Sequence, residues 1–180
     1  MRIISGKFKG RRIIASGKLP TRPTTDQAKE GLFNILSNNY NFNNLSVLDL
    51  FSGIGSVTFE FASRGTTDIT AVDNFYRCVK FVDKTAKELD IEVNTIKSDV
   101  FSFLKKPFRT YDIIFADPPY DFKDQQFEEI IAEVFKNEFL STNGLLILEH
   151  SKHTKLPAHP NFIEKRKYGS AVFSFYKNQK

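Results

Sequence analysis

Four aspartates stand within or just after four successive short apolar stretches of this sequence. Asp49 lies in "VLDLF", Asp73 ends "TAVD", Asp99 follows "NTIKS" and Asp117 follows "DIIFA". A carboxylate in or beside an apolar run is costly unless it has hydrogen-bond or charge partners. One such acid would mean little, but a repeated one has no structural need that we know of. We therefore interpret the four acids as parts of one ligand site.

The last of these acids opens the sequence Asp117-Pro118-Pro119-Tyr120. Two consecutive prolines have fixed φ angles and no backbone N–H, so they end a strand and stiffen the residues after it. Toward a base with an exocyclic amine, Asp117 and the Pro118 carbonyl would each accept one N–H, and Tyr120 would stack on the ring. A base paired in a helix would first have to flip out. By itself, the motif fits a tight turn before a helix equally well.

A glycine-containing turn follows the first apolar stretch, with Gly53 and Gly55 in "LFSGIGSVTF". Small residues in a first strand-to-helix turn let the backbone approach a ligand closely. The dinucleotide fingerprint has a third glycine where this chain has Thr58, so the two glycines alone predict a plain turn as readily as a binding loop. Asp49 would accept hydrogen bonds from the loop amides, or face a cationic ligand directly or through water.

The spacing of the next two acids fits an adenosine ligand. Asp73 lies 20 residues after Gly53, where an acid contacts the ribose hydroxyls in nucleotide-binding folds; its alternative role is a helix N-cap. Asp99 and Phe101 would give an adenine ring an acceptor for its amine and an apolar wall. No G-x-x-x-x-G-K-[ST] loop is present, which argues against ATP. Several carboxylates suit the cationic parts of S-adenosylmethionine and would repel a pyrophosphate.

The elements that must position these residues alternate between strand and helix. Strands are predicted at residues 47–51, 68–72, 92–96, 112–116 and 145–149, and helices at 24–37, from the glycine turn to Gly65, and at 76–89, 101–104 and 125–136. Such alternation indicates an α/β fold with a mostly parallel central sheet and helices on both faces, whose ligands bind at the carboxyl ends of the strands.

Both ends of the chain add antiparallel pieces to this predicted core. Residues 162–168 and 171–176 form a closing hairpin around Gly169 and Ser170, and residues 2–5 and 11–15 form a small β-hairpin around Gly6 and Gly10. We expect one domain over residues 1–180, with a basic hairpin extension at 1–22 and a Rossmann-like core at 45–180. Thr24 and Gln27 predict a capping box at the start of the first helix.

Basic residues gather at the two ends of the sequence. Residues 1–25 carry seven Lys and Arg and no acid, and residues 150–180 carry a net charge of +6, although the whole chain carries only +5. The part between them is therefore acidic. A patch of one sign commonly contacts nucleic acid, although lysines that merely solubilise a surface are the alternative. The contact residues we predict are Arg2, Lys7, Lys9, Arg11 and Arg12.

Composition favours a cytoplasmic protein. The chain has 180 residues and one cysteine, Cys78, which cannot form an internal disulfide. It has no apolar run of about 18 residues, and its first residues lack the apolar core of a signal peptide. We expect no membrane partner.

The order "LDLFSGIGS", "AVD", "SDVF" and "DIIFADPPY" resembles class I S-adenosylmethionine-dependent methyltransferases that act on amino groups. The segments "RIISGKFKGRRI", "TRPTTDQAKEGLFNIL", "LLILEHSK" and "KRKYGSAVFSFY" are similar to the bacterial RsmD group, which methylates N2 of guanine 966 in 16S rRNA. This resemblance spans nearly the whole chain. It implies a class I methyltransferase fold, S-adenosylmethionine as cofactor, and 16S rRNA or a small-subunit assembly intermediate as partner, with no DNA.

The resemblance also carries over site residues. It places the target amine at the motif 117–120, with Asp117, Pro118, Pro119 and Tyr120 catalytic. The cofactor residues it implies are Asp49, Phe51, Gly53, Gly55, Asp73, Asn74, Asp99, Val100, Phe101, Arg22, Thr24 and Thr25. The group commonly has arginines after the aspartate of R-P-T-T-D, where this chain has Gln27 and Lys29. Lysine lacks the bidentate fork of arginine, which puts a phosphate or carboxylate contact there in question.

Two other functions remain as alternatives. A DNA adenine-N6 methyltransferase shares the motif 117–120 but usually needs a target-recognition domain, for which 180 residues leave little room. A non-catalytic RNA-binding assembly factor would not need the motif and glycines intact. No metal is expected, because His150 and His153 follow a strand without further ligands at suitable spacing. Glu149 would line the pocket or lie on the surface, and Tyr168 would approach RNA or pack in the hairpin.

Overall fold

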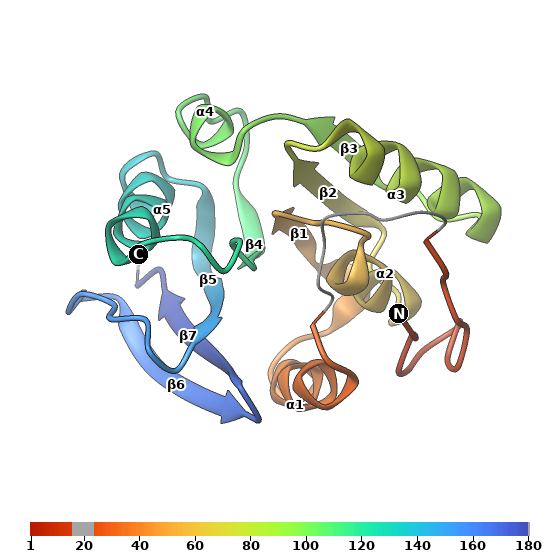
Figure 1. Cartoon of the computed structure of the whole chain (residues 1–180), viewed down its shortest axis with the longest axis horizontal. Coiled ribbons are helices and arrows are strands. Elements are labelled where there is room, and N and C mark those ends of the chain that lie inside the picture. The colour runs from red at the N-terminus through yellow and green to blue at the C-terminus, as the bar shows by residue number, and fades with distance from the viewer. Residues whose placement is uncertain (16–23, 180) are drawn as a thin grey trace.

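A seven-stranded sheet forms the centre of the computed structural model, which describes residues 1–15 and 24–179 (Figure 1). The strands are β1 (Ser46–Leu50), β2 (Asp68–Asp73), β3 (Asn94–Lys97), β4 (Tyr111–Ala116), β5 (Leu140–Ser151), β6 (Phe162–Tyr168) and β7 (Ala171–Lys177). The helices are α1 (Asp26–Ser37), α2 (Ser56–Ser63), α3 (Tyr76–Leu89), α4 (Val100–Leu104) and α5 (Asp124–Lys136), with a short 3-10 helix at Phe42–Asn44. The predicted alternation of strands and helices is confirmed, and α3 has the predicted bounds.

The strand order is β3-β2-β1-β4-β5-β7-β6. The first five of these strands run parallel, and β7 and β6 form the antiparallel hairpin predicted at the end of the chain. From β1 the chain adds β2 and β3 on one side and then returns to add β4 on the other. Ligands of open α/β sheets bind at the carboxyl ends of the strands beside such a reversal, which here lies between β1 and β4.

Helices cover both faces of the sheet (Figure 1). α4 and α5 pack on one face, with Leu48, Ile114 and Leu146 among the sheet residues beneath them. On the other face, α1 and α2 pack over alternate residues such as Val47, Phe115 and Ile147, and α3 packs beside α2 over Ala71. The predicted two-sided burial of the sheet is therefore confirmed.

The same alternation directs four carboxylates to one face. Asp49, Asp73, Asp117 and Glu149 each stand two positions after a core residue that faces α1–α3. Successive side chains of a strand point to opposite faces, so all four acids point toward the α1–α3 side. The ends of β1, β2, β4 and β5 thus bring together side chains up to 100 residues apart.

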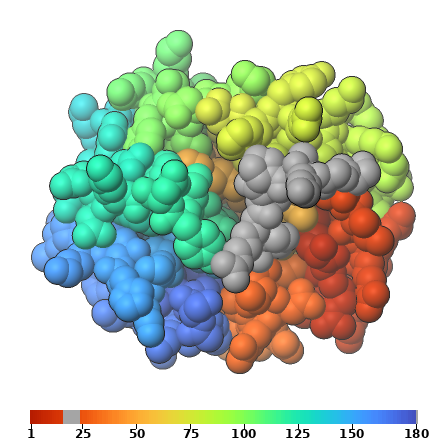
Figure 2. All heavy atoms as spheres, viewed as in Figure 1, coloured from red at the N-terminus to blue at the C-terminus, as the bar shows by residue number. Residues whose placement is uncertain are grey.

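The N-terminal hairpin is present in reduced form. Its two arms run antiparallel, but their β pairing is a single bridge between Arg2 and Arg12. The amides of Ile4 and Ser5 bond instead to the buried carboxylate of Glu60 on α2, at 2.8 and 3.1 Å. Ile4 and Ser5 thus bond to the core, whereas Met1 and Ile3 keep backbone bonds to the other arm. Figure 2 shows this N-terminal segment (red) beside α1 (orange) on the surface.

The predicted capping box at the start of α1 is wrong by one residue. The N-cap is Thr25, whose hydroxyl accepts a hydrogen bond from the amide of Ala28 at 3.2 Å. Thr24 instead donates its hydroxyl to Glu149 at the end of β5. The side chain of Thr24, predicted to cap the helix, is therefore engaged in a tertiary hydrogen bond with Glu149. No helix in the described part of the chain is long and apolar enough to span a membrane.

Candidate active site

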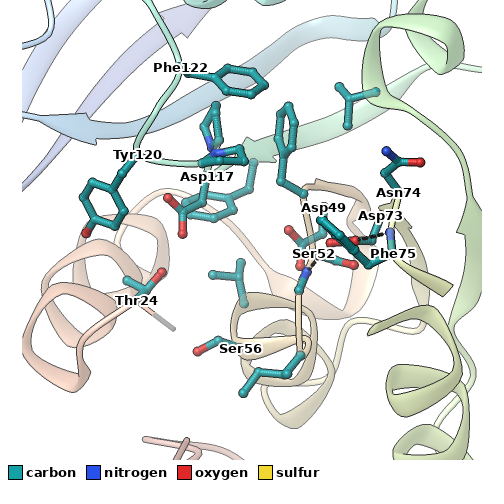
Figure 3. Close-up of a pocket in the computed structure, with 18 of the residues that line it drawn as sticks. Thr24, Asp49, Ser52, Ser56, Asp73, Asn74, Phe75, Asp117, Tyr120 and Phe122 are labelled. Atoms are coloured by element: carbon teal, nitrogen blue, oxygen red, sulfur yellow. Dashed lines mark hydrogen bonds between the residues drawn. The ribbon is translucent and has the colours of Figure 1, made fainter. Parts of the chain in front are cut away.

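A cavity of about 570 Å³ lies at the carboxyl ends of β1, β2 and β4 (Figure 3). Most of the predicted site residues line it: Thr24, Asp49, Phe51, Gly53, Asp73, Asn74, Asp99, Val100, Asp117, Pro118, Pro119 and Tyr120. Its remaining walls are Ser52, Ile54, Ser56, Val57, Phe75, Phe115 and Phe122. The position agrees with the strand reversal between β1 and β4, and the volume is in the range typical of small-molecule and cofactor sites.

The turn after β1 adopts a conformation that few residues tolerate. Phe51, Gly53 and Gly55 have φ angles of 60°, 53° and 78°. Gly53 lines the cavity, but Gly55 does not. A Cβ at Gly55 would lie 2.7 Å from the ring of Phe59 on α2 and 3.2 Å from Val82 on α3, so this glycine leaves room for the packing of α2 against α3. Only Gly53 of the pair is therefore placed to let backbone approach a ligand.

Asp73 fastens this turn to the end of β2. Its carboxylate accepts hydrogen bonds from the amide of Gly53 and from the amide of Phe75, both at 2.8 Å. The N-cap of α3 is Phe75, so Asp73 does not fill the alternative N-cap role. Each carboxylate oxygen has a further lone pair. Asp73 can therefore fix the shape of the loop and still accept a bond from a ligand hydroxyl in the cavity.

Asp49 is a buried carboxylate in the floor of the cavity, with 2% of its surface exposed. It accepts bonds from the amide and the hydroxyl of Thr58, at 3.1 and 2.5 Å, rather than from the glycine turn. Burial raises the pKa of Asp49 to about 7, although the Thr58 bonds act in the opposite direction. The residue in place of a third glycine thus supports the acid beneath the cavity.

Asp99 and Phe101 have structural roles that sequence reasoning missed. Asp99 is the N-cap of α4 and accepts a bond from the amide of Ser102 at 2.9 Å. It is exposed and lines the cavity. Phe101 does not line it; its ring stacks on Phe122, with centroids 6.1 Å apart. Phe122 also meets Phe51 edge to face, so the apolar wall is supplied by Phe51 and Phe122 with Phe101 behind.

The motif 117–120 forms the wall opposite the glycine turn (Figure 3). Burial raises the pKa of Asp117 well above its usual range, and the charges of Glu149 and Asp49 raise it further. The amide of Phe122 donates to the Pro119 carbonyl at 3.0 Å, which closes the turn after the prolines. Tyr120 lies at the mouth with 73% of its surface exposed, so its ring can contact a large ligand outside the cavity.

Thr24 and Glu149 form a buried pair beside Asp117. The Thr24 hydroxyl donates to a Glu149 carboxylate oxygen at 2.8 Å. Burial raises the pKa of Glu149 to about 7, and the Thr24 bond works against that shift. Thr25 is exposed and caps α1, outside the cavity lining. Arg22 lies outside the described residues.

The five predicted RNA-contacting residues are exposed on the N-terminal segment. Arg2 pairs with Asp26 at the start of α1, at 3.0 Å. Beneath the segment, the ammonium of buried Lys29 donates to the Arg2 carbonyl at 2.5 Å and lies 3.9 Å from Glu60. Lys29 thus holds the N-terminal segment to the core, which answers the open question of its role: the contact is structural.

Three side chains weighed in the sequence have internal hydrogen-bond partners, and a fourth, Cys78, is buried. His150 shares a hydrogen bond of 2.8 Å with the hydroxyl of Ser174. The Tyr168 ring packs against α1, where its hydroxyl donates to the Gly31 carbonyl at 3.3 Å. Cys78 is buried in α3, and burial raises the pKa of its thiol to about 11. Glu149 is also buried, so the alternative of a plain surface acid is wrong.

The sequence reasoning missed Phe75 and Phe122 as cavity walls. Phe75 follows Asn74 directly and is 52% exposed at the start of α3, and Phe122 follows the motif by two residues. An aromatic residue next to a predicted ligand contact was the signal available for both. Ser52 and Ser56 flank the glycines, and only the three-dimensional turn shows that they line the cavity.

Comparisons with known proteins place the chain among methyltransferases. The family described as conserved hypothetical protein 95 matches residues 1–177. Ribosomal RNA small subunit methyltransferase D of Buchnera aphidicola subsp. Baizongia pistaciae is 36% identical, over 99% of this chain and 92% of that protein. The putative rRNA methyltransferase YlbH of Bacillus subtilis is 30% identical, over 99% and 100%. The solved structure of the putative methyltransferase yhhF from Escherichia coli superimposes with a TM-score of 0.86 at 28% identity, over 99% and 98%.

Proposed function

This chain belongs to the RsmD family, described as conserved hypothetical protein 95, and we propose that it transfers a methyl group from S-adenosylmethionine to the exocyclic N2 amine of a guanine in small-subunit ribosomal RNA. By family resemblance the target is guanine 966 of 16S rRNA. The observation that carries the proposal is the cavity itself. It joins a glycine turn fixed by Asp73 to the Asp117–Tyr120 motif on the opposite wall.

The glycine-turn half of the cavity fits the cofactor. S-adenosylmethionine, when bound, supplies a methyl group on a positively charged sulfur. Asp73 would accept bonds from its ribose hydroxyls, and the unpaired lone pairs on that carboxylate allow it. Phe51, Phe75 and Phe122 offer apolar walls for the adenine. Asp49 below the turn adds negative charge toward the cationic end, as an acid with a pKa of about 7 can at neutral pH.

The other half fits a base with an exocyclic amine. Asp117 and the Pro118 carbonyl would accept its two hydrogens, and Tyr120 would stack on the ring. In the reaction the nitrogen gains a methyl group and loses a proton, which Asp117 is placed to take. Burial and the charges of Glu149 and Asp49 raise the pKa of Asp117, so its carboxylate is a stronger base than that of a free aspartate.

The exposed basic N-terminal segment supports RNA as the polymer that presents the base. Arg11 and Arg12 project from one arm, and Lys7 and Lys9 from the turn. The bonds that Glu60 accepts from this segment, and the one that Lys29 donates to it, hold it on the core. A basic surface fixed in this way would contribute sequence-independent phosphate contacts.

The test is transfer of a labelled methyl group to small ribosomal subunits, naked rRNA and DNA, followed by nucleoside analysis. N2-methylguanine in rRNA or in subunits is the expected product. N6-methyladenine in DNA as the only product would replace the proposal with the adenine alternative. Cofactor binding without transfer to any of the three substrates would favour a non-catalytic assembly factor.

A further inference from the structure

The Asp117–Tyr120 motif leaves one question open, because it can hold the amine of either guanine or adenine. Beside the motif lies the pair of Thr24 and Glu149, in which the donor and the acceptor of the hydrogen bond are known. Thr24 is 6% exposed and Glu149 is 8% exposed, and the Thr24 hydroxyl donates to the Glu149 carboxylate at 2.8 Å. Thr24 lines the same cavity as Asp117 (Figure 3).

The sheet explains why this pair adjoins the target amine. β4 and β5 are parallel neighbours, with Ala116 opposite Leu148. The next residues along, Asp117 and Glu149, therefore stand side by side and on the same face. Thr24, two residues before α1 begins, reaches them from the side of the sheet that α1 covers.

The bond to Glu149 determines what Thr24 can offer to a ligand. A hydroxyl has one hydrogen to donate and two lone pairs to accept with. The single hydrogen of Thr24 is committed to a buried carboxylate, so toward the cavity the oxygen is an acceptor. If the hydroxyl hydrogen turned to the cavity, the buried Glu149 carboxylate would lose its hydrogen bond. That loss costs more free energy than the loss of a hydrogen bond at the surface.

Guanine and adenine differ at the atom next to the amine. The ring N1 beside the guanine N2 amine carries a hydrogen, whereas the N1 beside the adenine N6 amine is an acceptor. We propose that the Thr24 hydroxyl, held by Glu149, selects guanine by accepting the N1 hydrogen of a base whose amine is bound at Asp117. Adenine would bring two acceptors together at that point. This inference rests on the proposed function and adds its base specificity.

The sharpest probe keeps the 2-amine and changes only the ring edge. 2-Aminopurine has the same amine as guanine, but its N1 has no hydrogen and it lacks O6. We would compare small subunits reconstituted with rRNA that carries guanine, 2-aminopurine or adenine at the methylated position. Transfer at pH 8, where Glu149 with its pKa of about 7 is ionised, gives a selectivity ratio for each enzyme variant. Wild-type enzyme should prefer guanine over 2-aminopurine by about tenfold or more, as expected for loss of a buried hydrogen bond.

Glu149→Gln is the informative variant. Its side-chain amide can donate to the Thr24 oxygen as well as accept from it, so the hydroxyl hydrogen is no longer held toward residue 149, with almost no change in shape. The selectivity for guanine over 2-aminopurine should fall by about tenfold. Thr24→Val, which removes the hydroxyl at nearly constant volume, should lower it similarly, and Thr24→Ser should keep the wild-type ratio.

The ratio separates specificity from a merely structural role, because a loosened fold would slow transfer to both bases alike. Thermal unfolding and S-adenosylmethionine titration of each variant identify any that are misfolded, and Glu149→Gln and Thr24→Val provide two independent routes. Unchanged ratios in both folded variants would overturn the inference while leaving guanine methylation by wild type intact. Failure of wild type to methylate guanine in subunits or rRNA would overturn the proposed function, and the inference with it.

Discussion

The backbone amide of Gly53 donates a 2.8 Å hydrogen bond to the carboxylate of Asp73, joining the turn after β1 to the end of β2. The two residues were linked in the sequence only by their spacing of 20. In the structure Asp73 has a second role beside the predicted contact with a ligand: its bond to Gly53 fixes the shape of the loop that the ligand would meet. Substitution of Asp73 should therefore affect cofactor binding through two contacts at once.

Asp73→Ala should weaken S-adenosylmethionine binding by about tenfold or more, since hydrogen bonds to a carboxylate contribute about 1.5–3 kcal/mol each. Isothermal titration calorimetry measures the affinity directly. Asp83→Ala is the matched control, because Asp83 lies on α3 and pairs with exposed Lys87. Equal affinities for the two variants would remove Asp73 from the cofactor site.

Asp117→Ala should reduce methyl transfer at least about a hundredfold while leaving cofactor affinity within about threefold of wild type. The reason is that a base positioned on the reacting group contributes about 10²–10⁴ to the rate, whereas Asp117 stands opposite the glycine turn. Single-turnover transfer and calorimetry together separate the two effects. Exposed Asp121, four residues on, provides the control variant Asp121→Ala. Near-normal turnover of the Asp117 variant would refute its catalytic role.

Reversal of both Arg11 and Arg12 to Glu should weaken rRNA binding and flatten its dependence on salt, because fewer counterions are released per complex. Fluorescence anisotropy over a series of salt concentrations gives both quantities. The same charge change at Lys105 and Lys106, which are exposed at the end of α4 on the opposite face of the sheet, is the control. If the two double variants bind alike, the N-terminal segment is no special contact surface.

Glu60→Gln should destabilise the fold by about 3 kcal/mol, because it leaves the ammonium of Lys29 buried without its charge partner. It would also weaken the bonds that hold Ile4 and Ser5 on α2. Denaturant unfolding measures the loss, and Glu88→Gln, which breaks an exposed pair with Lys84, should cost less than about 1 kcal/mol. Similar losses in both variants would show that the buried pair is not a special support of the segment.

Stability should fall as pH rises through the range in which Asp49 ionises. Burial raises the folded-state pKa of Asp49 to about 7, whereas an unfolded aspartate titrates near about 3.9. Between these values the folded state binds more protons, so the stabilisation present below about pH 4 is lost by about pH 7. Unfolding free energies of wild type and Asp49→Asn at pH 5 and pH 8 test this. The variant should lose less stability over that interval; an identical loss would contradict a buried ionising Asp49.

The strand and helix pattern was predictable because each element has a clear hydrophobic period, as the agreement at α3 shows. The length of β5 was not. It begins at Leu140, five residues before the predicted start, and passes through Ser141–Gly144 with Asn143 at a φ of 61°. Polar residues and a glycine predict a loop there. Pairing with β4 on either side, together with Asn178, which donates to the Leu140, Ser141 and Gly144 carbonyls, keeps this irregular stretch in the sheet.

Some features of the candidate site were likewise predictable from the sequence, and others were not. The acids at strand ends could be found from sequence because parallel strands place their carboxyl ends together. The contact between Thr24 and Glu149 could not, because 125 residues separate them and Thr24 also fits a helix cap. Local chemistry identifies which residues can bind, and packing decides which partner each one takes.

The packing of Tyr168 on α1 has a consequence for inheritance. A Cβ at Gly31 would lie 2.2 Å from the Tyr168 ring, so the helix and β6 meet only because residue 31 has no side chain. A substitution that adds a side chain at position 31 therefore requires a compensating change at position 168. In descendants of this gene, a larger residue at 31 should survive only together with a smaller one at 168, and the two codons should therefore change as a pair.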